Sequence, residues 1–355
     1  MSLIFYGICG EGLGHCNRSL AIIESMPDCR FVVLTYGNAY DYMSQLKMGN
    51  VSLIKIEGLR FAEKDGAFKF WGTVKNCVKY LFSRHKNNEV MQSYPTPDLV
   101  ITDWEPSVAK FARANRIKCI SIDSQHKFRF SSPKNLSFFL RAYSYLVAFL
   151  CRIMIGRVHH YVVSSFQKDL MEDRANLTTL QSFIRSNLLK LSPVCGDYLV
   201  IYARQKEIAK KIIDSIKGSS FNHLPIVCYG SYLKGYSNVQ FSAVNSEEFV
   251  KDISSCRAVF STAGTQLIGE CCYLGKPICV VPIPGQYEQS VNAVHVNWLG
   301  VGVGTTMEDM SPEIVNSFLE KIPTIQRRPS DTQTAVLLIK TLMESPYECN
   351  PFCIY

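Results

Sequence analysis

The sequence has few charged residues for its length. Asp, Glu, Lys and Arg make up 19% of the 355 residues, below the average of about 25%, whereas 47% are apolar. This composition excludes a mainly disordered chain. The apolar stretch 136–155 is interrupted by Arg141 and Arg152, so we expect no transmembrane helix.

The 14 cysteines include no C-x-x-C pair, which argues against a zinc ribbon or a thioredoxin-like motif. Residues 1–6 contain no basic residue, and Gly10 and Gly12 interrupt the apolar run that follows, so no signal peptide is expected. Many of the cysteines lie in apolar runs. We therefore expect reduced thiols in a cytoplasmic protein.

The net positive charge of the chain comes entirely from its first half. Residues 1–189 hold 24 Lys and Arg against 15 Asp and Glu, whereas residues 190–355 hold 14 against 15. Such an asymmetry indicates an anionic partner for the first half. Nucleic acid and an acidic membrane surface are both candidates.

Short apolar runs alternate with helical patterns along the whole chain. The first half predicts strands at 2–8, 30–36, 51–57, 98–102, 117–122 and 159–164, and the second half at 198–203, 224–230, 238–243, 258–261 and 278–283. This rhythm is typical of α/β units with parallel sheets. We predict two Rossmann-like domains that face each other across a cleft, at 1–189 and 190–330, followed by a C-terminal helix and tail at 331–355.

A glycine-rich loop, Gly10-Glu11-Gly12-Leu13-Gly14-His15, joins the first predicted strand to the first predicted helix. Free amides at such a helix start favour an anionic ligand. A Walker A loop would need Gly-Lys-Ser/Thr, which is absent. A dinucleotide fingerprint would need glycine where His15 stands and an acid after the second strand, where Thr35-Tyr36-Gly37-Asn38 stands. A nicotinamide or flavin cofactor is therefore not expected.

Two acid–histidine pairs are candidates for proton transfer. His15 and Asp103 both follow predicted strands, and a carboxylate beside an imidazole fixes its tautomer. Asp123 and His126 follow the next strand and form a competing pair. Asp103 is also a plausible helix cap, and the spacing alone does not separate the two pairs.

Two loops of the second half repeat the strand-to-helix pattern. Residues 261–265, Ser-Thr-Ala-Gly-Thr, open a predicted helix at 265–274 that carries Glu270. Residues 281–293 include Glu288 and Gln289 at the start of another helix. A diphosphate at the first helix start and a ribose at Glu270 would suit this arrangement, although either loop alone reads equally well as a turn with a cap.

Taken together, these motifs resemble the GT-B nucleotide-sugar glycosyltransferases, in the bacterial and archaeal branch related to the UDP-glycosyltransferases and the peptidoglycan GlcNAc transferase. The resemblance covers nearly the whole chain. It is carried, in order, by Gly10-x-Gly12-x-Gly14-His15-x-x-Arg18, Thr102-Asp103-x-Glu105-Pro106, Ala263-Gly264 with Glu270, Gly275-Lys276-Pro277, and Glu288-Gln289-x-x-Asn292-Ala293.

The resemblance implies an inverting transfer of a sugar from a nucleotide sugar, with UDP as the expected nucleotide, to an acceptor hydroxyl. It implies that His15 is the catalytic base and Asp103 its partner. The donor is expected at Gly12, Gly14, Gly264, Thr265, Glu270, Glu288 and Gln289. Neither a metal nor a separate cofactor is expected, because helix amides and dipole offset the charge of the leaving diphosphate.

The sequence departs from the plant and animal members at three positions. Thr262 stands where those enzymes have His, and Gln266 and Leu267 stand where they have Asn and Ser. One phosphate contact of the family is therefore in question here. The residues that would read the nucleotide base are not evident.

The acceptor is expected on the basic first domain. Stretches 60–86 and 127–157 mix cations with aromatic residues, and Arg60, Lys69, Trp71, Asp123 and His126 are candidate acceptor contacts. One interpretation is a peripheral enzyme on the inner membrane face that glycosylates a lipid or cell-surface glycan precursor. A second is a phage-type transferase that modifies hydroxymethylated DNA bases. In a third interpretation, the aromatic residues belong to the hydrophobic core and the charged residues form a solvent-exposed face without a partner.

Two further alternatives concern the activity itself. A nucleotide-sugar 2-epimerase shares this fold and acts on the donor alone, so it needs no basic acceptor face. An inactive sugar-nucleotide binder would not need His15, Glu270 and the Glu288-Gln289 pair. Product analysis with UDP-GlcNAc and no acceptor distinguishes the epimerase from the transferase.

Overall fold

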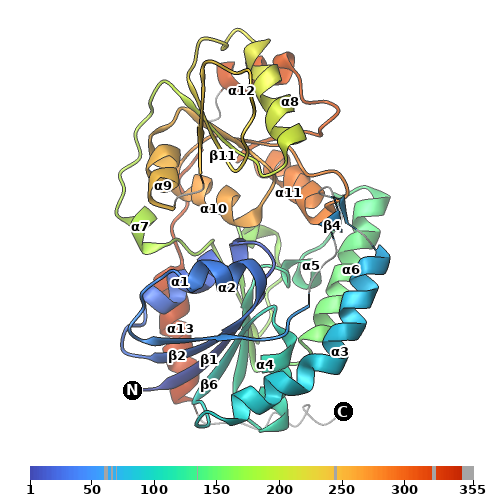
Figure 1. Cartoon of the computed structure of the whole chain (residues 1–355), viewed down its shortest axis with the longest axis vertical. Coiled ribbons are helices and arrows are strands. Elements are labelled where there is room, and N and C mark those ends of the chain that lie inside the picture. Colours follow the sequence, from blue (N-terminus) through green and yellow to red (C-terminus); the bar gives the residue numbers. More distant parts are fainter. Residues whose placement is uncertain are drawn as a thin grey trace. The chain divides into compact units, whose positions relative to one another are not determined.

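The computed structural model describes residues 1–59, 63–64, 67–68, 70–133, 135–243, 246–321 and 325–345. The chain forms two compact units (Figure 1). The first contains Met1–Lys64, Phe68–Phe183 and the stretch from Asp331, and the second contains Ile184–Ser330. Each unit is an α/β structure built on one parallel sheet, which confirms the fold class predicted from the alternating pattern.

The sheet of the first unit has seven strands in the order β3-β2-β1-β6-β7-β8-β9. Six of them match the predicted strands. The seventh, β9 at the edge, was not predicted, because a four-residue strand buried only at its two ends shows no periodicity in the sequence. The strands are β1 (Leu3–Ile8), β2 (Arg30–Thr35), β3 (Val51–Lys55), β6 (Leu99–Asp103), β7 (Cys119–Asp123), β8 (His160–Ser164) and β9 (Leu177–Leu180).

Helices pack on this sheet, and one apolar cluster combines Ile4, Tyr6, Phe31 and Ile101 of the strands with Ile22 of α1. The helices are α1 (Gly14–Glu24), α2 (Gly37–Met43), α3 (Phe70–Gln92), α4 (Pro106–Ala114), α5 (Lys127–Phe130), α6 (Phe138–Met154) and α13 (Thr332–Glu344), with a 3₁₀ turn at Lys168–Leu170. Two short strands, β4 (Glu63–Lys64) and β5 (Ala67–Phe68), pair with each other.

The sheet of the second unit has six strands in the order β12-β11-β10-β13-β14-β15. Five were predicted, and β15 was missed because its Gly-Val-Gly sequence has a low strand propensity. The strands are β10 (Leu199–Tyr202), β11 (Ile226–Tyr229), β12 (Val239–Ser242), β13 (Ala258–Ser261), β14 (Ile278–Val280) and β15 (Gly302–Gly304). The helices are α7 (Ser186–Leu189), α8 (Lys206–Lys217), α9 (Ser246–Ser255), α10 (Thr265–Leu274), α11 (Tyr287–Trp298) and α12 (Pro312–Glu320).

Both sheets reverse their strand order at one point. In the first unit the chain runs from β1 outward to β3 and then returns to β6 beside β1. In the second it runs from β10 to β12 and returns to β13 beside β10. Ligands of open α/β sheets bind at the carboxyl ends of the strands at such a reversal. The loops after β1, β6 and β13 are therefore the places to look for a site.

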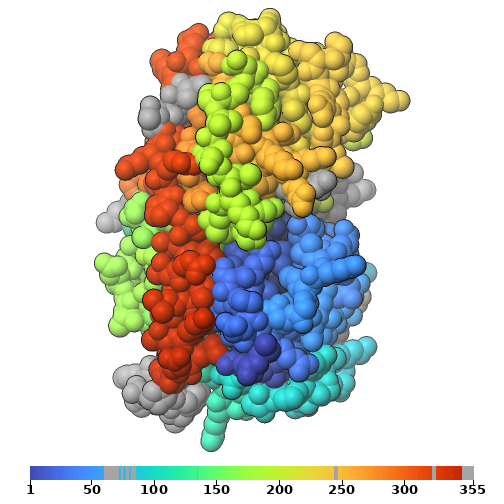
Figure 2. Space-filling model, turned by 90° about the vertical axis from the view of Figure 1, so that its left-hand side faces the viewer, coloured from blue at the N-terminus to red at the C-terminus, as the bar shows by residue number. Residues whose placement is uncertain are grey.

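The C-terminal helix α13 returns to the first unit and packs beside α1 (Figures 1 and 2). Its Ala335, Val336 and Ile339 join the core of that unit. Lys118, almost fully buried just before β7, donates to the carbonyls of Leu342 and Ser345. A helix end leaves its last carbonyls without backbone partners, so this cation closes α13 and ties it to the sheet.

We predict that Lys118→Ala lowers the free energy of unfolding of the first unit by about 1–3 kcal/mol, because it removes a charged donor from the last carbonyls of α13. Calorimetry of the full chain should show a lower melting temperature for that unit. The matched control is Lys340→Ala, which removes an exposed lysine of α13. Equal melting temperatures for the two variants would contradict this role of Lys118.

Candidate active site

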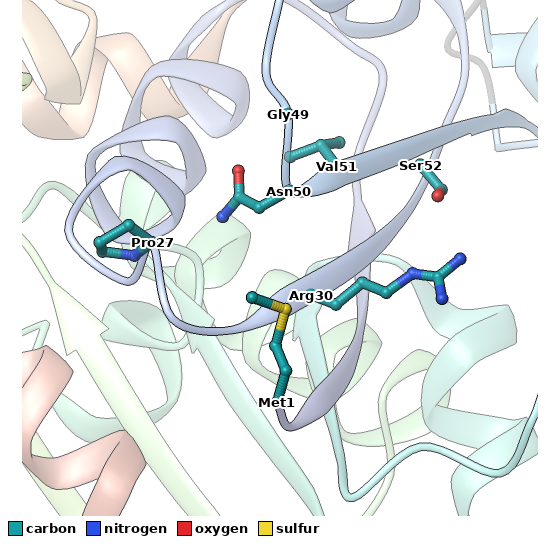
Figure 3. A pocket seen from close by; sticks show the side chains of 7 residues that line it. All are labelled: Met1, Pro27, Arg30, Gly49, Asn50, Val51 and Ser52. Carbon is teal, nitrogen blue, oxygen red and sulfur yellow. The ribbon is translucent and has the colours of Figure 1, made fainter.

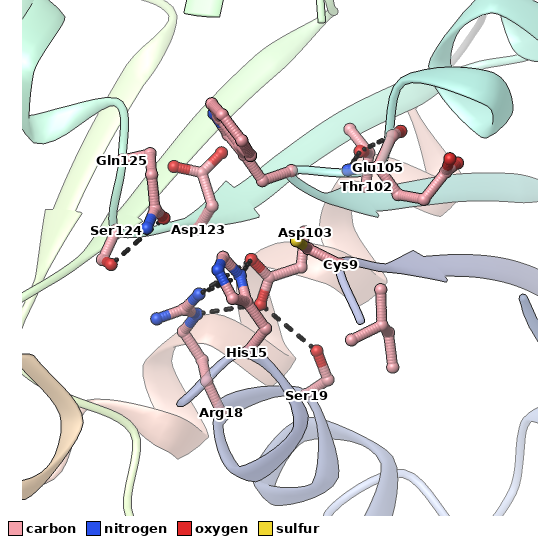
Figure 4. Close-up of polar contacts among 12 residues, drawn as sticks. Cys9, His15, Arg18, Ser19, Thr102, Asp103, Glu105, Asp123, Ser124 and Gln125 are labelled. Atoms are coloured by element: carbon pink, nitrogen blue, oxygen red, sulfur yellow. Dashed lines mark hydrogen bonds and ion pairs between the residues drawn. The ribbon is translucent and has the colours of Figure 1, made fainter. Parts of the chain in front are cut away.

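Asp103 is the organising residue at the carboxyl edge of the first sheet. It is the last residue of β6, and parallel pairing places it opposite Ile8, the last residue of β1. The side chain is fully buried. Its oxygens accept hydrogen bonds from Arg18 and Ser19 and contact His15 (Figure 4). Because β1 leads directly into the loop before α1, the sheet register itself brings these groups together.

His15 lies in the first turn of α1, with its Nδ1 2.7 Å from Asp103 Oδ1. A carboxylate only accepts hydrogen bonds, so Nδ1 carries the proton and Nε2 of the neutral ring carries the lone pair. Arg18 Nη2, 3.1 Å from Nδ1, then makes a close approach and not a second hydrogen bond to that nitrogen. The His15 side chain is 12% exposed, so the ring is not sealed in the core.

Arg18 holds the other side of the same carboxylate. Its Nε donates to Oδ2 at 3.0 Å and its Nη2 to Oδ1 at 2.7 Å. Burial by itself opposes the charge, but the attraction of Asp103 outweighs it and raises the pKa of Arg18 above its usual value. The guanidinium therefore keeps its charge and offsets that of the buried carboxylate. Sequence reasoning included Arg18 in the motif but assigned it no role.

The capping role considered for Asp103 belongs to Glu105. The Glu105 side chain accepts from the Val108 amide at 2.9 Å and from Ser107 at 2.7 Å, at the start of α4. Burial raises its pKa, an effect that these two hydrogen bonds oppose. Between the two acids, Trp104 has a left-handed backbone with φ 56°. That conformation is strained for a bulky residue. It turns the chain between Asp103, which faces α1, and Glu105, which caps α4.

The competing pair, Asp123 and His126, is also formed, but inside the core. His126 Nδ1 lies 2.6 Å from Asp123 Oδ2, and both side chains are at most 1% exposed. The ring is covered by Phe130 and Tyr161. Burial would raise the pKa of Asp123, but His126 and Ser121 together lower it. The structure thus separates the two pairs by access, which the spacing alone could not do.

The glycines of the first loop have different surroundings. A side chain at Gly10 would collide with the Tyr36 carbonyl, so this glycine is required for packing. Gly12 has φ +72° and open space where a side chain would stand. Gly14 is the first residue of α1, and the Leu13 cap position supplies no side-chain hydrogen bond. The start of α1 therefore has uncapped amides beside free space.

In the second unit, α10 begins directly after β13 at the strand reversal. Gly264 occupies the cap position, offers no side chain and faces open space. Thr265 is the first residue of α10, and Glu288 lies in the first turn of α11. The Thr265 hydroxyl donates a hydrogen bond to Glu288 Oε1 at 3.4 Å. Asn292 donates to the Ala263 carbonyl at 2.8 Å and to Thr265 Oγ1 at 3.1 Å. The two predicted loops thus meet, and their helix starts lie together.

Glu270 is 2% exposed and faces Arg185, whose Nη2 is 3.3 Å from Oε1 and 3.5 Å from Oε2. Gln266 donates to Oε1 at 3.1 Å. Most of the contact therefore falls on Oε1, and Oε2 keeps capacity to accept. Arg185 was not singled out from the sequence, because it lies just before the short helix α7 and belongs to no motif.

Two other motif residues serve the local structure. Gln289 accepts from the Ile283 amide at 2.9 Å and so closes its own loop. Lys276 is buried and donates to the carbonyls of Val194 and Cys256, and burial lowers its pKa. Between α10 and this lysine, Gly275 adopts the left-handed conformation that ends the helix.

The structure does not describe three of the predicted acceptor contacts. Arg60, Lys69 and the side chain of Trp71 are outside the described residues.

A separate pocket borders Met1, Pro27, Arg30 and residues 49–52 (Figure 3). It lies at the starts of β2 and β3, which is the edge of the sheet opposite to His15. Within the described ranges, no three His, Cys, Asp or Glu side chains are grouped so that they could hold a metal.

Comparison with known proteins agrees with this geometry. The family model of glycosyl transferase family 1 matches residues 2–323. No curated protein matches the chain. Among solved structures, the chain is similar to the glycotransferase of kitacinnamycin, with 12% identity, TM-score 0.68 and coverage of 96% of this chain and 99% of the other.

Two further structures are similar over nearly their whole length. Arabidopsis thaliana UGT89C1 complexed with UDP-L-rhamnose has 12% identity and TM-score 0.61, with 97% and 94% of the two chains covered. Acinetobacter baumannii MurG has 15% identity and TM-score 0.58, with 95% and 99% covered. At these identities the likeness shows the fold, which is that of the GT-B glycosyltransferases.

We predict that Asp123 stabilises the protein in a pH-dependent way. Because its folded pKa is lowered, its contribution is present above the ordinary aspartate pKa of about 4 and is lost as the pH falls. The melting temperature of the native protein should therefore fall more steeply between about pH 5 and pH 3 than that of Asp123→Asn. The exposed Asp41→Asn serves as the control, and parallel curves for Asp123→Asn and the native chain would contradict the assignment.

Proposed function

The chain belongs to glycosyl transferase family 1, and we propose that it transfers a sugar from a UDP-sugar to an acceptor hydroxyl with inversion at the anomeric carbon. The acceptor we propose is a lipid or a cell-surface glycan precursor. The first unit supplies the base and the acceptor site, and the second unit supplies the donor site. No resident metal or separate cofactor takes part.

The observation that carries this proposal is the difference between the two histidines. Both contact a buried carboxylate through Nδ1. His15 is partly exposed beside an open glycine loop, whereas His126 is covered by aromatic side chains. A base must reach the proton that it removes. His15 therefore fits the role of the base, and Asp123 with His126 fits a supporting role behind the acceptor side.

In the proposed reaction, His15 Nε2 accepts the proton of the acceptor hydroxyl. The hydroxyl oxygen attacks the anomeric carbon from the face opposite the diphosphate, and the bond from that carbon to the diphosphate oxygen breaks. The electron pair leaves with the diphosphate. Asp103 stabilises the imidazolium that forms and holds the ring in the required tautomer.

The second unit offers what a departing diphosphate needs. The start of α10 lies at Gly264, where the cap position makes no side-chain hydrogen bond and a side chain would meet open space, and it offers the positive end of the helix dipole to the diphosphate. Glu270 Oε2 has capacity for a ribose hydroxyl, and Glu288 stands beside Thr265 for the sugar. Together they bind and stabilise the donor without a metal ion.

We predict that His15→Ala lowers kcat by about 10²–10⁴-fold, the usual contribution of a general base. The affinity for UDP, measured by calorimetry, should change little because most of the proposed donor residues belong to the second unit. Asp103→Asn should reduce kcat in the same direction by a smaller factor. His223→Ala, an exposed histidine of the second unit, is the control. Near-native turnover by His15→Ala would refute the assignment.

For Glu270 we predict a binding defect. Glu270→Gln keeps the volume and the contact with Gln266 but loses the charge, so the donor KM should rise about 10–100-fold with kcat within a few-fold of native. The Gln variant is chosen because Ala would leave Arg185 buried without a partner. Initial rates over a donor series measure both constants, and an unchanged KM with a collapsed kcat would rule out the ribose role.

A further inference from the structure

Helix α6 turns an apolar face outward from the first unit. Its exposed side chains include Phe138 at 87%, Tyr145 at 61%, Phe149 at 57% and Ile153 at 62%. These residues recur at spacings of seven, four and four, so they form one stripe along the helix. Phe139 and Leu146 widen the same stripe and are also more than half exposed.

The opposite face of α6 is the one that packs. Ser144, Val147 and Cys151 are buried, and Cys151 Sγ lies 3.3 Å from Trp104 Nε1. Tyr143 stacks edge-on against Phe128 of α5. The helix is therefore anchored to its unit by a narrow inner face, and the apolar stripe is not part of the described core.

The chain segment that contains α6 carries charge of one sign. Residues 124–168 contain no Asp or Glu but seven Lys and Arg. Arg141 and Arg152 are exposed on α6 itself and, at 3.6 residues per turn, border the stripe on one side. An apolar centre with a cationic edge is complementary to a surface that is apolar below and anionic above.

We propose that α6 is a membrane-docking helix that inserts Phe138, Phe149 and Ile153 into the acyl boundary of an anionic bilayer while Arg141 and Arg152 contact lipid phosphates. Among the described residues, no helix is long and apolar enough to cross a membrane, so the attachment is at the surface. This inference goes beyond the transfer reaction and stands without it.

The arrangement favours lipid over nucleic acid. A nucleic-acid surface needs cations at its centre, where the phosphates lie, whereas here the cations lie at the border and the centre is aliphatic and aromatic. The link from Cys151 to Trp104 also connects the helix with the residue that follows Asp103. Docking would therefore hold the unit that carries His15 at the membrane.

The test is flotation of the full chain with vesicles of phosphatidylcholine containing about 30 mol% phosphatidylglycerol, compared with pure phosphatidylcholine. We expect binding to the anionic vesicles that weakens in high salt. Phe138→Ser with Phe149→Ser should reduce the partition coefficient by about tenfold or more. Arg141→Gln and Arg152→Gln should each reduce it by about fivefold.

The matched control is Leu337→Ser, which removes an apolar side chain that is 67% exposed on α13 of the same unit; it should float like the native protein. His15→Ala should also float normally, so the outcome is separate from that of the transfer reaction. Absence of flotation with anionic vesicles would overturn the proposal. So would unchanged flotation of the Phe variant, or tight binding to an oligonucleotide or a stable dimer in place of vesicle binding.

Discussion

The buried carboxylate of Asp103 is the interaction on which the rest of the first unit's site depends. A fully buried charge is costly unless it is paired and hydrogen-bonded. Arg18 supplies the opposite charge, and Ser19 and His15 occupy the remaining acceptor capacity. All three partners lie on α1, so one carboxylate at the end of β6 fixes how that helix begins. The helix start has no side-chain cap, and Gly12 in the loop before it borders open space.

The second unit also contains a buried carboxylate that is paired with an arginine. Glu270 is buried on α10 and faces Arg185, so an acid next to the strand reversal is again balanced by an arginine. The difference lies in the second partner. Asp103 orients an imidazole that can exchange a proton, whereas Glu270 is contacted by the amide of Gln266, which cannot. The proposed division of labour, with proton transfer in one unit and donor binding in the other, follows from that difference.

Much of this could be predicted from the sequence, because the chemistry follows strand ends. The parallel strands were visible as apolar runs, and His15, Asp103 and Gly264 stand at or shortly after the ends of β1, β6 and β13. Two kinds of information were missing. Burial separates the His15 pair from the His126 pair, and burial is a property of packing that spacing does not encode. Long-range partners such as Arg185, and the return of α13 to Lys118, have no local signature. Short or glycine-rich edge strands, β9 and β15, were lost for the same reason.

The central claim is that Asp103 holds His15 with its proton on Nδ1. The direct measurement is ¹⁵N NMR of the histidine side chains at a pH where the imidazoles are neutral, with the His15 signals assigned by their loss in His15→Gln. We predict a protonated Nδ1 and an unprotonated Nε2 for His15, and a shift toward the other tautomer in Asp103→Asn. A native His15 that carries its proton on Nε2 would contradict the claim, because the lone pair of the ring would then lie on Nδ1 beside Asp103 and Nε2 could not accept the proton of the acceptor.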